Sequence, residues 1–402
     1  MSDADEFAFF AGDLNKQSMI AGITIASHLP EMCHERGDIS GGFRESNHIE
    51  SLHKDMRKRG IPMPLKVLLI GGTGTISMAI TRRLAAQGHQ VFLFNRGSRT
   101  AELPENVITL RGDISNEAEA AAILNGMQFD AVGEFIGFTT EQVQRDVRLF
   151  SGKTRQYLYI SSASAYQKPL SESVITESTP LCNPYWQYSR DKIACEAYLM
   201  QQYRENGFPV TIVRPSHTYD ERSVPLGVHG KNGSWQVVQR ILEGKPVIIH
   251  GDGTSLWTIT HNSDFAKGYC GLVGNIHAIG QAYHITSDER VTWNQIYQCI
   301  ADTLNVPLKA CHIPSDFLAA ISDYDFEGSL IGDKASTVIF DNTKIKRAVP
   351  EFRADIRADQ GIRQTVQHLL AHPELQQTDP EFDTWCDRVI TAFEALKGEL
   401  AL

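Results

Sequence analysis

The sequence contains no apolar run approaching the roughly 18 residues that a membrane-spanning helix needs, so no transmembrane segment is expected. It is also poor in basic residues, with 38 Lys and Arg against 48 Asp and Glu, which gives a net charge of −10. Such a charge repels phosphate backbones and disfavours nucleic-acid binding. The opening residues MSDADEFAFF are acidic where a secretory signal would be basic, and a cytoplasmic location is expected.

Cysteine pairing is absent as well. The seven cysteines are scattered and include no Cys-x-x-Cys pair, which favours reduced thiols in a cytoplasmic protein over a disulfide framework. One group of possible metal ligands near the N-terminus, Cys33, His34, His48 and His53, has no spacing typical of zinc sites. We therefore expect no metal.

What the sequence does contain, from residue 65 onward, is a regular alternation of short apolar runs and amphipathic stretches. The apolar runs predict buried parallel strands over 66–70, 90–94, 107–113, 129–137, 156–162 and 209–215. The amphipathic stretches between them predict helices, for example over 77–88 and 142–152. The alternation predicts an α/β fold, a Rossmann-like doubly wound parallel sheet, with ligands at the carboxyl ends of its strands.

A glycine cluster, LLIGGTGTIS (68–77), follows the first predicted strand and opens the first helix. Gly71 permits a tight turn, and Gly74 lets the backbone approach a pyrophosphate. The amides that follow lie at a helix N-terminus, where the helix dipole favours an anion. The cluster predicts a dinucleotide site formed by Gly71, Thr73, Gly74, Thr75 and Ile76, with Ser77 at the third small position.

The second predicted strand ends in LFNRG (93–97). An NAD site usually places a carboxylate there for the ribose hydroxyl, whereas this chain has Asn95 followed by Arg96, with Arg99 nearby. An uncharged residue beside a cation suits a 2′-phosphate, so we expect NADP, with NAD as the alternative. Asp113 and Ile114, at the end of the third strand, are expected to contact the adenine.

Tyr188 and Lys192 stand four residues apart in YWQYSRDKIACE (185–196). On a helix, such residues lie on one face, one turn apart. A nearby ammonium favours the ionised form of a phenol. A tyrosine held in this way can act as an acid or base near neutral pH, although its unperturbed pKa is about 10.

Together these motifs resemble the extended short-chain dehydrogenase/reductase family, the NAD-dependent epimerase/dehydratase group, over about residues 65–350. The resemblance also rests on SSASAY (161–166), RPSHTY (214–219) and GDGT (251–254). It implies that Ser162 binds the substrate oxygen, that Tyr188 exchanges the proton, and that Lys192 lowers the tyrosine pKa and holds the nicotinamide ribose. It also implies a cofactor contact at Pro215, hydride transfer to or from a sugar or sugar-nucleotide carbinol, and a possible homodimer.

Three positions depart from the pattern that the resemblance implies. Ala163 and Ser164 stand where 4,6-dehydratases carry an Asp–Glu pair, so water elimination is disfavoured. Trp257 falls near the place of an arginine that often binds the substrate pyrophosphate, and an aromatic ring cannot neutralise phosphate. The fourth strand runs into GEFIGF (133–138) instead of a turn of small residues.

Substrate-binding candidates are Ser164, His217 and Trp257, and His217 is either a second acid/base or a structural histidine. Further candidates with weaker support are His229, Lys231, Trp235 and His261.

The chain then divides into an irregular N-terminal extension (1–62), which we expect to be dispensable, an NAD(P)-binding domain (63–216) to which later segments return, a smaller α+β substrate-binding lobe (217–350) and a helical tail (351–402). Two alternatives to catalysis remain. One is a vestigial NADP(H)-binding protein, and the other is an RNA-associated relative of the chloroplast stem-loop binding proteins.

Overall fold

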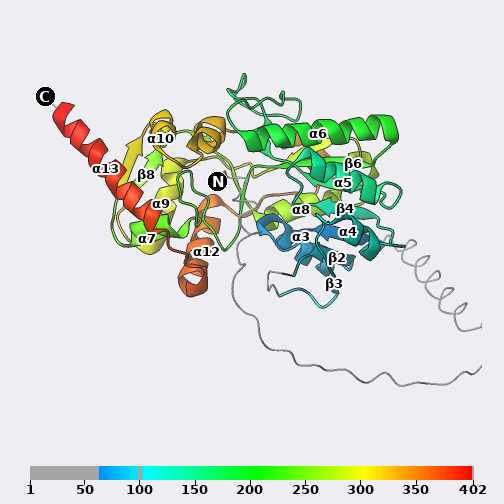
Figure 1. Ribbon diagram of the computed structural model, residues 1–402. Helices are drawn as coiled ribbons and strands as arrows, with labels where there is room; N and C mark the ends of the chain where they lie inside the picture. The colour runs from blue at the N-terminus through cyan, green and yellow to red at the C-terminus, as the bar shows by residue number, and fades with distance from the viewer. Residues whose placement is uncertain (1–62, 98–101, 401–402) are drawn as a thin grey trace, which may run out of the picture. The chain divides into compact units, whose positions relative to one another are not determined.

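The computed structural model describes residues 63–97 and 102–400, so the extension predicted over 1–62 lies outside the described residues. A seven-stranded sheet forms the first half of the fold, in the order β11-β6-β5-β4-β1-β2-β3, and every pairing in it is parallel (Figure 1). The strands are β1 (Lys66–Ile70), β2 (Gln90–Asn95), β3 (Val107–Arg111), β4 (Ala131–Glu134), β5 (Tyr157–Ile160), β6 (Val210–Pro215) and β11 (Ala282–Ile285).

Helices cover both faces of this sheet, which confirms the predicted Rossmann-like α/β fold. On one face lie α3 (Thr75–Ala86) and α8 (Asn262–Leu272), joined by α11 (Thr343–Ala348). On the other face lie α4 (Glu117–Ile123), α5 (Thr140–Phe150) and the long helix α6 (Gln187–Asn206) (Figure 1).

The strands are buried on both faces, as their continuous apolar runs predicted. Along β1, Val67 and Leu69 pack in the core beneath α3 and α8, whereas Leu68 and Ile70 pack beneath α4, α5 and α6. Each side chain is at most 1% exposed. Burying an aliphatic side chain of this size stabilises the fold by about 1.5–3 kcal/mol, so substitutions along β1 affect both cores.

The second half of the fold has its own hydrophobic core, built from helices and three two-stranded sheets. The sheets pair β7 (His217–Tyr219) with β10 (Ile259–His261), β8 (Val247–His250) with β13 (Ala310–Ile313), and β9 (Leu256–Trp257) with β12 (Val291–Thr292). The helices are α7 (Trp235–Leu242), α9 (Trp293–Leu304), α10 (Ser315–Ile321), α12 (Ala358–Ala371) and α13 (Pro380–Leu400). Shorter turns complete the fold, namely the 3-10 turns η1 (Ala163–Ala165), η2 (Ile276–Ala278) and η4 (Pro373–Leu375) and the π-helix η3 (Glu327–Lys334).

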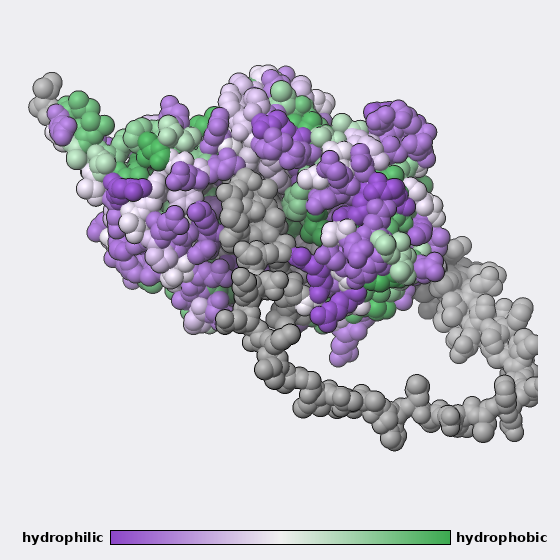
Figure 2. Space-filling model, viewed as in Figure 1, coloured by the Kyte–Doolittle hydropathy of each residue, from purple (hydrophilic) through white to green (hydrophobic). Residues whose placement is uncertain are grey.

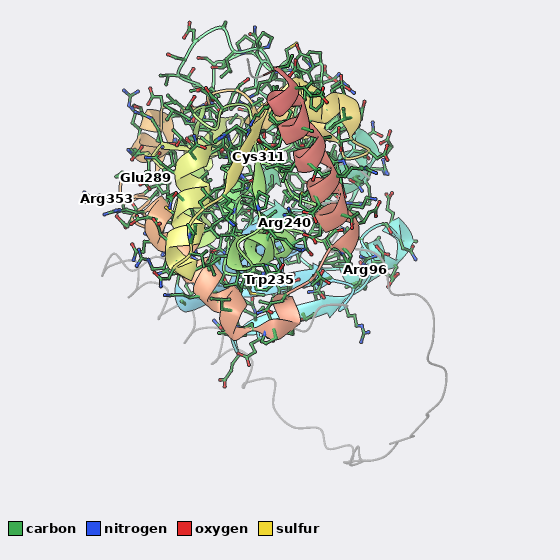
Figure 3. The ribbon with its side chains drawn as sticks, turned by 90° about the vertical axis from the view of Figure 1, so that its left-hand side faces the viewer. Arg96, Trp235, Arg240, Glu289, Cys311 and Arg353 are labelled. Atoms are coloured by element: carbon green, nitrogen blue, oxygen red, sulfur yellow. The ribbon has the colours of Figure 1, made fainter. Side chains whose placement is uncertain are left out.

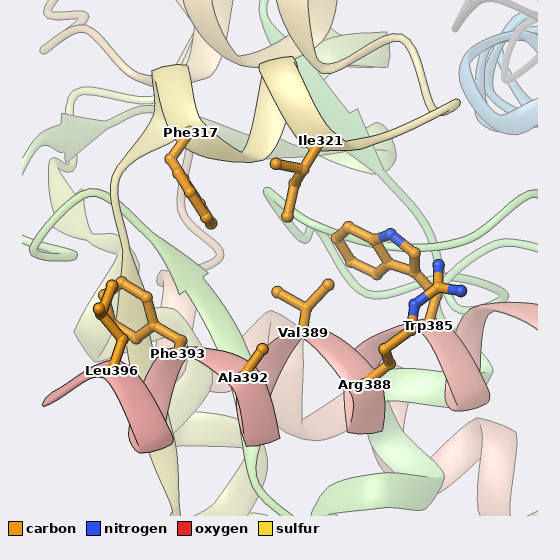
Figure 4. Close-up of a pocket in the computed structure, with 8 residues that line it drawn as sticks. All are labelled: Phe317, Ile321, Trp385, Arg388, Val389, Ala392, Phe393 and Leu396. Carbon is orange, nitrogen blue, oxygen red and sulfur yellow. The ribbon is translucent and has the colours of Figure 1, made fainter. Parts of the chain in front are cut away.

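The C-terminal helix α13 packs on this second core. Arg240 of α7, fully buried, pairs with Asp383 at 2.6 Å and with Asp387 at 2.7 Å, and so anchors α7 to α13 (Figure 3). Farther along, α13 and α10 enclose an apolar groove (Figure 4) that includes Phe317 and Leu396. Apolar residues show on the surface near this end of α13 (Figure 2). Across residues 63–97 and 102–400, no helix combines the length and apolar character needed to cross a membrane.

Candidate active site

The glycine turn between β1 and α3 has the geometry that the sequence predicted. Gly71 has a φ of +81°, and a Cβ there would lie 2.7 Å from Cγ2 of Ile136. Only glycine adopts this conformation without strain and leaves that space open. The hydroxyl of Ser77 donates to the Gly71 oxygen at 2.7 Å and accepts from the Gly74 amide at 2.8 Å. Ser77 therefore closes the turn, and α3 begins at Thr75 with its N-terminus at the carboxyl edge of the sheet.

The end of β2 holds the residues predicted to select between NAD and NADP. The side-chain oxygen of Asn95 accepts from the Gly97 amide at 3.0 Å, which fixes the turn, while Arg96 is exposed. Asp113 is held in its own turn, since its carboxylate accepts from the Ser115 amide and hydroxyl at 2.9 and 2.7 Å. The hydrogen bonds from Ser115 lower the pKa of Asp113, and the charge of Arg96 lowers it further. Arg99 lies outside the described residues.

Tyr188 and Lys192 lie one turn apart on α6, as predicted. The Lys192 ammonium donates to the main-chain oxygens of Gly137 at 2.8 Å and Ile160 at 2.9 Å, and it lies 5.8 Å from the centroid of the Tyr188 ring. Lys192 is 1% exposed, and its burial lowers the pKa of its amine to about 8. The Tyr188 ring packs between Trp186 and Phe138, with centroids at 5.0 and 6.4 Å. A cation is therefore fixed beside the phenol.

A chain of three serines connects the η1 turn to the same helix. Ser162 and Ser164 share a hydroxyl–hydroxyl hydrogen bond of 2.8 Å, and Ser189 of α6 donates to the Ser164 hydroxyl at 2.8 Å. The Ser162 oxygen also accepts from the Ser164 amide at 3.1 Å. Because Ser189 donates to Ser164, the Ser164 hydroxyl can in turn donate its hydrogen bond to Ser162. The Ser162 hydroxyl can then donate outward, which is what binding a substrate oxygen requires.

The turn after β4 joins the glycine turn to the pair of Tyr188 and Lys192. Ile136 packs against Gly71, and the next residue, Gly137, accepts the hydrogen bond from Lys192. Four predicted site residues, Gly71, Ser162, Tyr188 and Lys192, are thus brought to one edge of the sheet. The Gly-rich turn and the helix N-terminus fit a dinucleotide, which these residues would hold by its phosphates.

Sequence comparison identifies the family. A sequence model described as "NAD dependent epimerase/dehydratase family" matches residues 67–286, more than half of the chain. The protein belongs to the NAD dependent epimerase/dehydratase family. The resemblance inferred from the motifs is confirmed.

Several relatives share this family's core. The 2'-dehydrokanamycin reductase of Streptomyces kanamyceticus is 24% identical over 290 residues, covering 72% of this chain and 80% of the relative. The chloroplast stem-loop binding protein of 41 kDa b of Arabidopsis thaliana is 26% identical over 257 residues, covering 60% of this chain and 64% of the relative. Among solved structures, the epimerase Mth375 of Methanothermobacter thermautotrophicus has a TM-score of 0.64 at 17% identity, with 78% of this chain and 94% of that chain covered.

The segment GEFIGF (133–138), which departs from the expected turn of small residues, forms the turn that holds Lys192. Glu134, the last residue of β4, is fully buried, and its carboxyl oxygen accepts from the Ile136 amide at 2.5 Å. Burial and the negative charge of Asp146 raise the pKa of Glu134 well above its ordinary value, which favours the neutral carboxyl. A Cβ on Gly137 would lie 3.1 Å from Glu134 Cγ. Glu134 therefore shapes the turn whose carbonyl binds Lys192.

His217 and Trp257, two of the predicted substrate residues, contact each other directly. The indole nitrogen of Trp257 donates to Nδ1 of His217 at 3.1 Å, which leaves the imidazole proton on Nε2. Burial lowers the pKa of His217 well below its ordinary value. A histidine held neutral in this way is a hydrogen-bond donor at neutral pH and is poorly suited to exchange protons there. Trp257 is 2% exposed, and its ring packs 5.2 Å from that of Trp293.

Two arginines near the proposed cofactor site were not among the candidates that the sequence offered. Arg222, which follows β7, donates to the Thr75 hydroxyl at 3.3 Å and pairs with Asp220, so a guanidinium lies at the N-terminus of α3. Arg111 of β3 lies opposite Asn95 in the sheet register, and its Nε is 3.2 Å from the position of a Cβ on Gly97. The parallel register gives a signal for Arg111, because it places the ends of β2 and β3 together. No local pattern could connect Arg222 to Thr75.

The weaker candidates have other contacts. Lys231 forms a surface ion pair with Glu381 at 3.7 Å, Trp235 packs in the second core, and the His261 side chain caps the N-terminus of α8. Within the described part of the chain, no group of three His, Cys, Asp or Glu could hold a metal ion. The N-terminal group of Cys33, His34, His48 and His53 lies outside it.

Proposed function

We propose that the protein is an NADP-dependent epimerase or oxidoreductase that transfers hydride to or from a carbinol carbon of a sugar or sugar nucleotide. The observation that carries the proposal is the buried ammonium of Lys192 beside the Tyr188 ring, next to a turn that also packs on Gly71. Burying a cation is costly unless hydrogen bonds compensate it, as the main-chain oxygens of Gly137 and Ile160 do for Lys192. The ammonium held there favours the ionised form of a nearby phenol. Family membership and the similarity to a reductase support this function.

Three side chains perform the proton chemistry in this proposal. Ser162 donates a hydrogen bond to the carbinol or carbonyl oxygen. Tyr188 accepts the carbinol proton in oxidation and returns it in reduction, and Lys192 stabilises the phenolate by its charge. When bound, the cofactor supplies or accepts the hydride at nicotinamide C4. Ser164, which is 3% exposed and bonded to Ser162 and Ser189, orients Ser162.

Water elimination is not part of the proposal. Elimination from a sugar needs an acid and a base close to the carbonyl. The two positions that follow Ser162 are Ala163 and Ser164, and neither supplies a carboxylate. The chemistry available at these residues is therefore oxidation, reduction or epimerisation through a ketone.

For the cofactor, we propose NADP, with NAD as the alternative. Arg96 and Arg111 place two cations at the end of β2, where a ribose 2′-phosphate would lie, and Asn95 adds no negative charge. Arg222 would contact the pyrophosphate that NAD and NADP have in common, because it lies at the N-terminus of α3. The family is NAD dependent by its description, so the preference for NADP over NAD rests on these side chains.

An RNA-associated role is the second candidate, favoured by the similarity to the chloroplast stem-loop binding protein. The net charge of −10 opposes it, because RNA binding gains most of its free energy from cations that neutralise phosphates. The presence of Ser162, Tyr188 and Lys192 together is unnecessary for RNA binding and favours catalysis. RNA affinity that falls steeply with added salt, in a protein that oxidises no NADPH, would reverse this choice.

The deciding experiment replaces Tyr188 with phenylalanine in the full-length protein. NADPH oxidation is followed with a panel of keto-sugars and keto-sugar nucleotides, and cofactor binding is measured by calorimetry. We expect turnover to fall about 10²- to 10⁴-fold while NADPH binding is retained. Tyr198→Phe, ten residues farther along α6, is the matched control and should keep wild-type turnover. Unchanged turnover in Y188F would refute the proposed role of the phenol.

A further inference from the structure

An apolar groove runs between α10 and α13 and has a volume of about 360 Å³ (Figure 4). From α10, Phe317 and Ile321 point towards α13, and they are 42% and 41% exposed although both are large apolar side chains. From α13, the groove is lined in part by Phe393 and Leu396. The ring centroids of Phe317 and Phe393 lie 6.2 Å apart, so the two helices contact each other along the groove. Contiguous exposed apolar side chains of this kind mark interaction surfaces on proteins.

The apolar stripe of α13 continues past the part of the helix that the second core covers. Val389 is 7% exposed, whereas Leu396 is 47% and Leu400 73% exposed, about two and three turns farther along. Their spacing keeps the three side chains on one face of the helix. The same helix therefore carries one wall of a groove and, next to it, an uncovered apolar ridge. A two-fold dimer needs a surface that complements itself, and a ridge beside a groove meets that need.

Two exposed charges flank this stripe on the same edge. Arg388 lies at one end of the groove (Figure 4), and Glu399 lies eleven residues, or about three turns, farther along α13. Among residues 63–97 and 102–400, no ion pair or side-chain hydrogen bond involves either of them. By contrast, Glu394 and Lys397, on the other edge of the stripe, pair with each other at 2.7 Å. The stripe thus has a positive charge towards one end and a negative charge towards the other.

The order of these charges favours an antiparallel pairing of two α13 helices. If a second copy of the helix runs in the opposite direction, with a two-fold axis near residue 394, Arg388 of each copy faces Glu399 of the other. The same axis places Val389 of each copy opposite Leu400 of the other. In a parallel pairing each Arg388 would face its own equivalent, and the like charges would repel. Charge and apolar pattern therefore agree on a single arrangement.

We propose that the protein forms a two-fold dimer in which the C-terminal half of α13 of each copy lies in the groove of the other. Leu396 and Leu400 of one copy enter the groove beside Phe317 of the other, and ion pairs between Arg388 and Glu399 close both ends. Removing these apolar side chains from water drives the association. The inference goes beyond the proposed function and does not depend on it, because α13 carries none of the residues proposed to bind cofactor or substrate.

The experiment measures self-association of the full-length protein by sedimentation velocity over a range of concentrations. We expect the wild-type protein to dimerise. Leu396→Asp places a carboxylate in the apolar contact twice per dimer, because of the two-fold axis, and should raise the dimer Kd about 100-fold or more. Thr391→Asp, at an exposed position on the opposite face of α13, is the matched control and should associate as the wild type does.

A charge exchange tests the direction of the two helices. Arg388→Glu and Glu399→Arg should each raise the dimer Kd about tenfold, because each puts two pairs of like charges into the interface. The double variant R388E/E399R restores opposite charges only in an antiparallel dimer and should recover most of the wild-type affinity. Both side chains are exposed, so these variants should fold and keep the test valid even if L396D does not.

Three outcomes would overturn the proposal. A wild-type protein that stays monomeric would mean that the groove takes another occupant, such as an apolar ligand or a different protein. A dimer whose Kd is unchanged in L396D would associate through another face. A double variant that associates no more tightly than R388E would exclude the antiparallel pairing of α13.

Discussion

The ammonium of Lys192 is held 2.8 Å from the main-chain oxygen of Gly137, in a turn that also packs on Gly71, the first glycine of the proposed nucleotide site. Gly137 O also accepts from the Tyr159 hydroxyl at 3.0 Å. The position of the lysine is thus set by main-chain groups at the ends of β4 and β5. This relationship ties the geometry of the proposed catalytic pair to the sheet edge. Substitutions of the buried groups around this turn should therefore change the position or the charge of Lys192.

Lys192 should give the stability of the protein a specific pH dependence. Its pKa in the folded state is lowered to about 8, and its ordinary value is 10.5. Between these pH values the unfolded chain binds the proton that the folded protein has lost, so folding becomes more favourable as pH rises through this window. Relative to Lys192→Met, the wild-type protein should therefore gain stability between about pH 8 and 10.5 and show a constant difference below pH 8.

The measurement is urea unfolding of both proteins at pH 7, 8.5 and 10, because groups common to both cancel in the difference. Lys346→Met, at an exposed lysine paired with Asp288, is the control and should show no such gain. A difference between wild type and K192M that stays flat from pH 7 to 10 would show that the amine keeps an ordinary pKa.

Glu134 gives a pH dependence of the opposite sign. Its folded pKa is raised well above 4.5 by burial and by Asp146, so the folded protein holds a proton that the unfolded chain releases. Stability from this residue is present below about pH 4.5 and is lost as pH rises towards its folded pKa. Glu134→Gln mimics the neutral carboxyl and should become progressively more stable than wild type as pH rises above about 4.5, while keeping turnover.

Glu134→Ala separates the shape of the turn from the charge. It removes the acceptor of the Ile136 amide and leaves a cavity beside Gly137, so it should destabilise the protein by about 2–4 kcal/mol and reduce turnover through Lys192. Denaturant unfolding and NADPH oxidation measure the two effects. If E134A turns over as wild type does, the turn does not position the lysine.

The sequence predicted the sheet and the placement of Tyr188 and Lys192 on one helix because both follow from short-range patterns. Continuous apolar runs identify strands buried on two faces, and a spacing of four places Tyr188 and Lys192 on one helix face. The contacts of Arg222 with Thr75 and of Lys334 with Trp186 join distant segments, and no periodicity records them. His217 could be identified as a candidate, but its tautomer depends on Trp257, a partner that only the folded chain brings near.

Arg222 and Arg96 should affect cofactor binding in different ways. Arg222 lies at the N-terminus of α3, where the proposed pyrophosphate site is common to both cofactors, whereas Arg96 follows β2 at the proposed ribose site. Arg222→Gln should weaken NADH and NADPH binding by similar factors, about tenfold or more, since charged hydrogen bonds contribute about 1.5–3 kcal/mol. Arg96→Gln should weaken NADPH alone.

Calorimetric titration of both cofactors into each variant makes this comparison. Arg148→Gln, at an exposed arginine that pairs with Glu117 at 2.7 Å, is the control and should change neither affinity. Selective loss of NADPH binding in R222Q would show that Arg222 contacts the 2′-phosphate and not the pyrophosphate. Tighter binding of NADH than of NADPH by the wild-type protein would contradict the proposed preference for NADP.

Gly71 can be compared with a second glycine that shares its backbone conformation. Gly71 has a φ of +81° and Gly152 a φ of +71°, but a Cβ on Gly71 would lie 2.7 Å from Ile136, whereas a Cβ on Gly152 would have no atom within 4 Å. Gly152→Ala therefore measures the cost of the left-handed conformation alone, about 1–3 kcal/mol. Gly71→Ala should cost more than this and also abolish NADPH binding, because Ile136 or the turn must move. Urea unfolding and calorimetry of the two variants test the difference, and equal stability losses with intact NADPH binding would mean that the contact between Gly71 and Ile136 is not needed to shape the cofactor site.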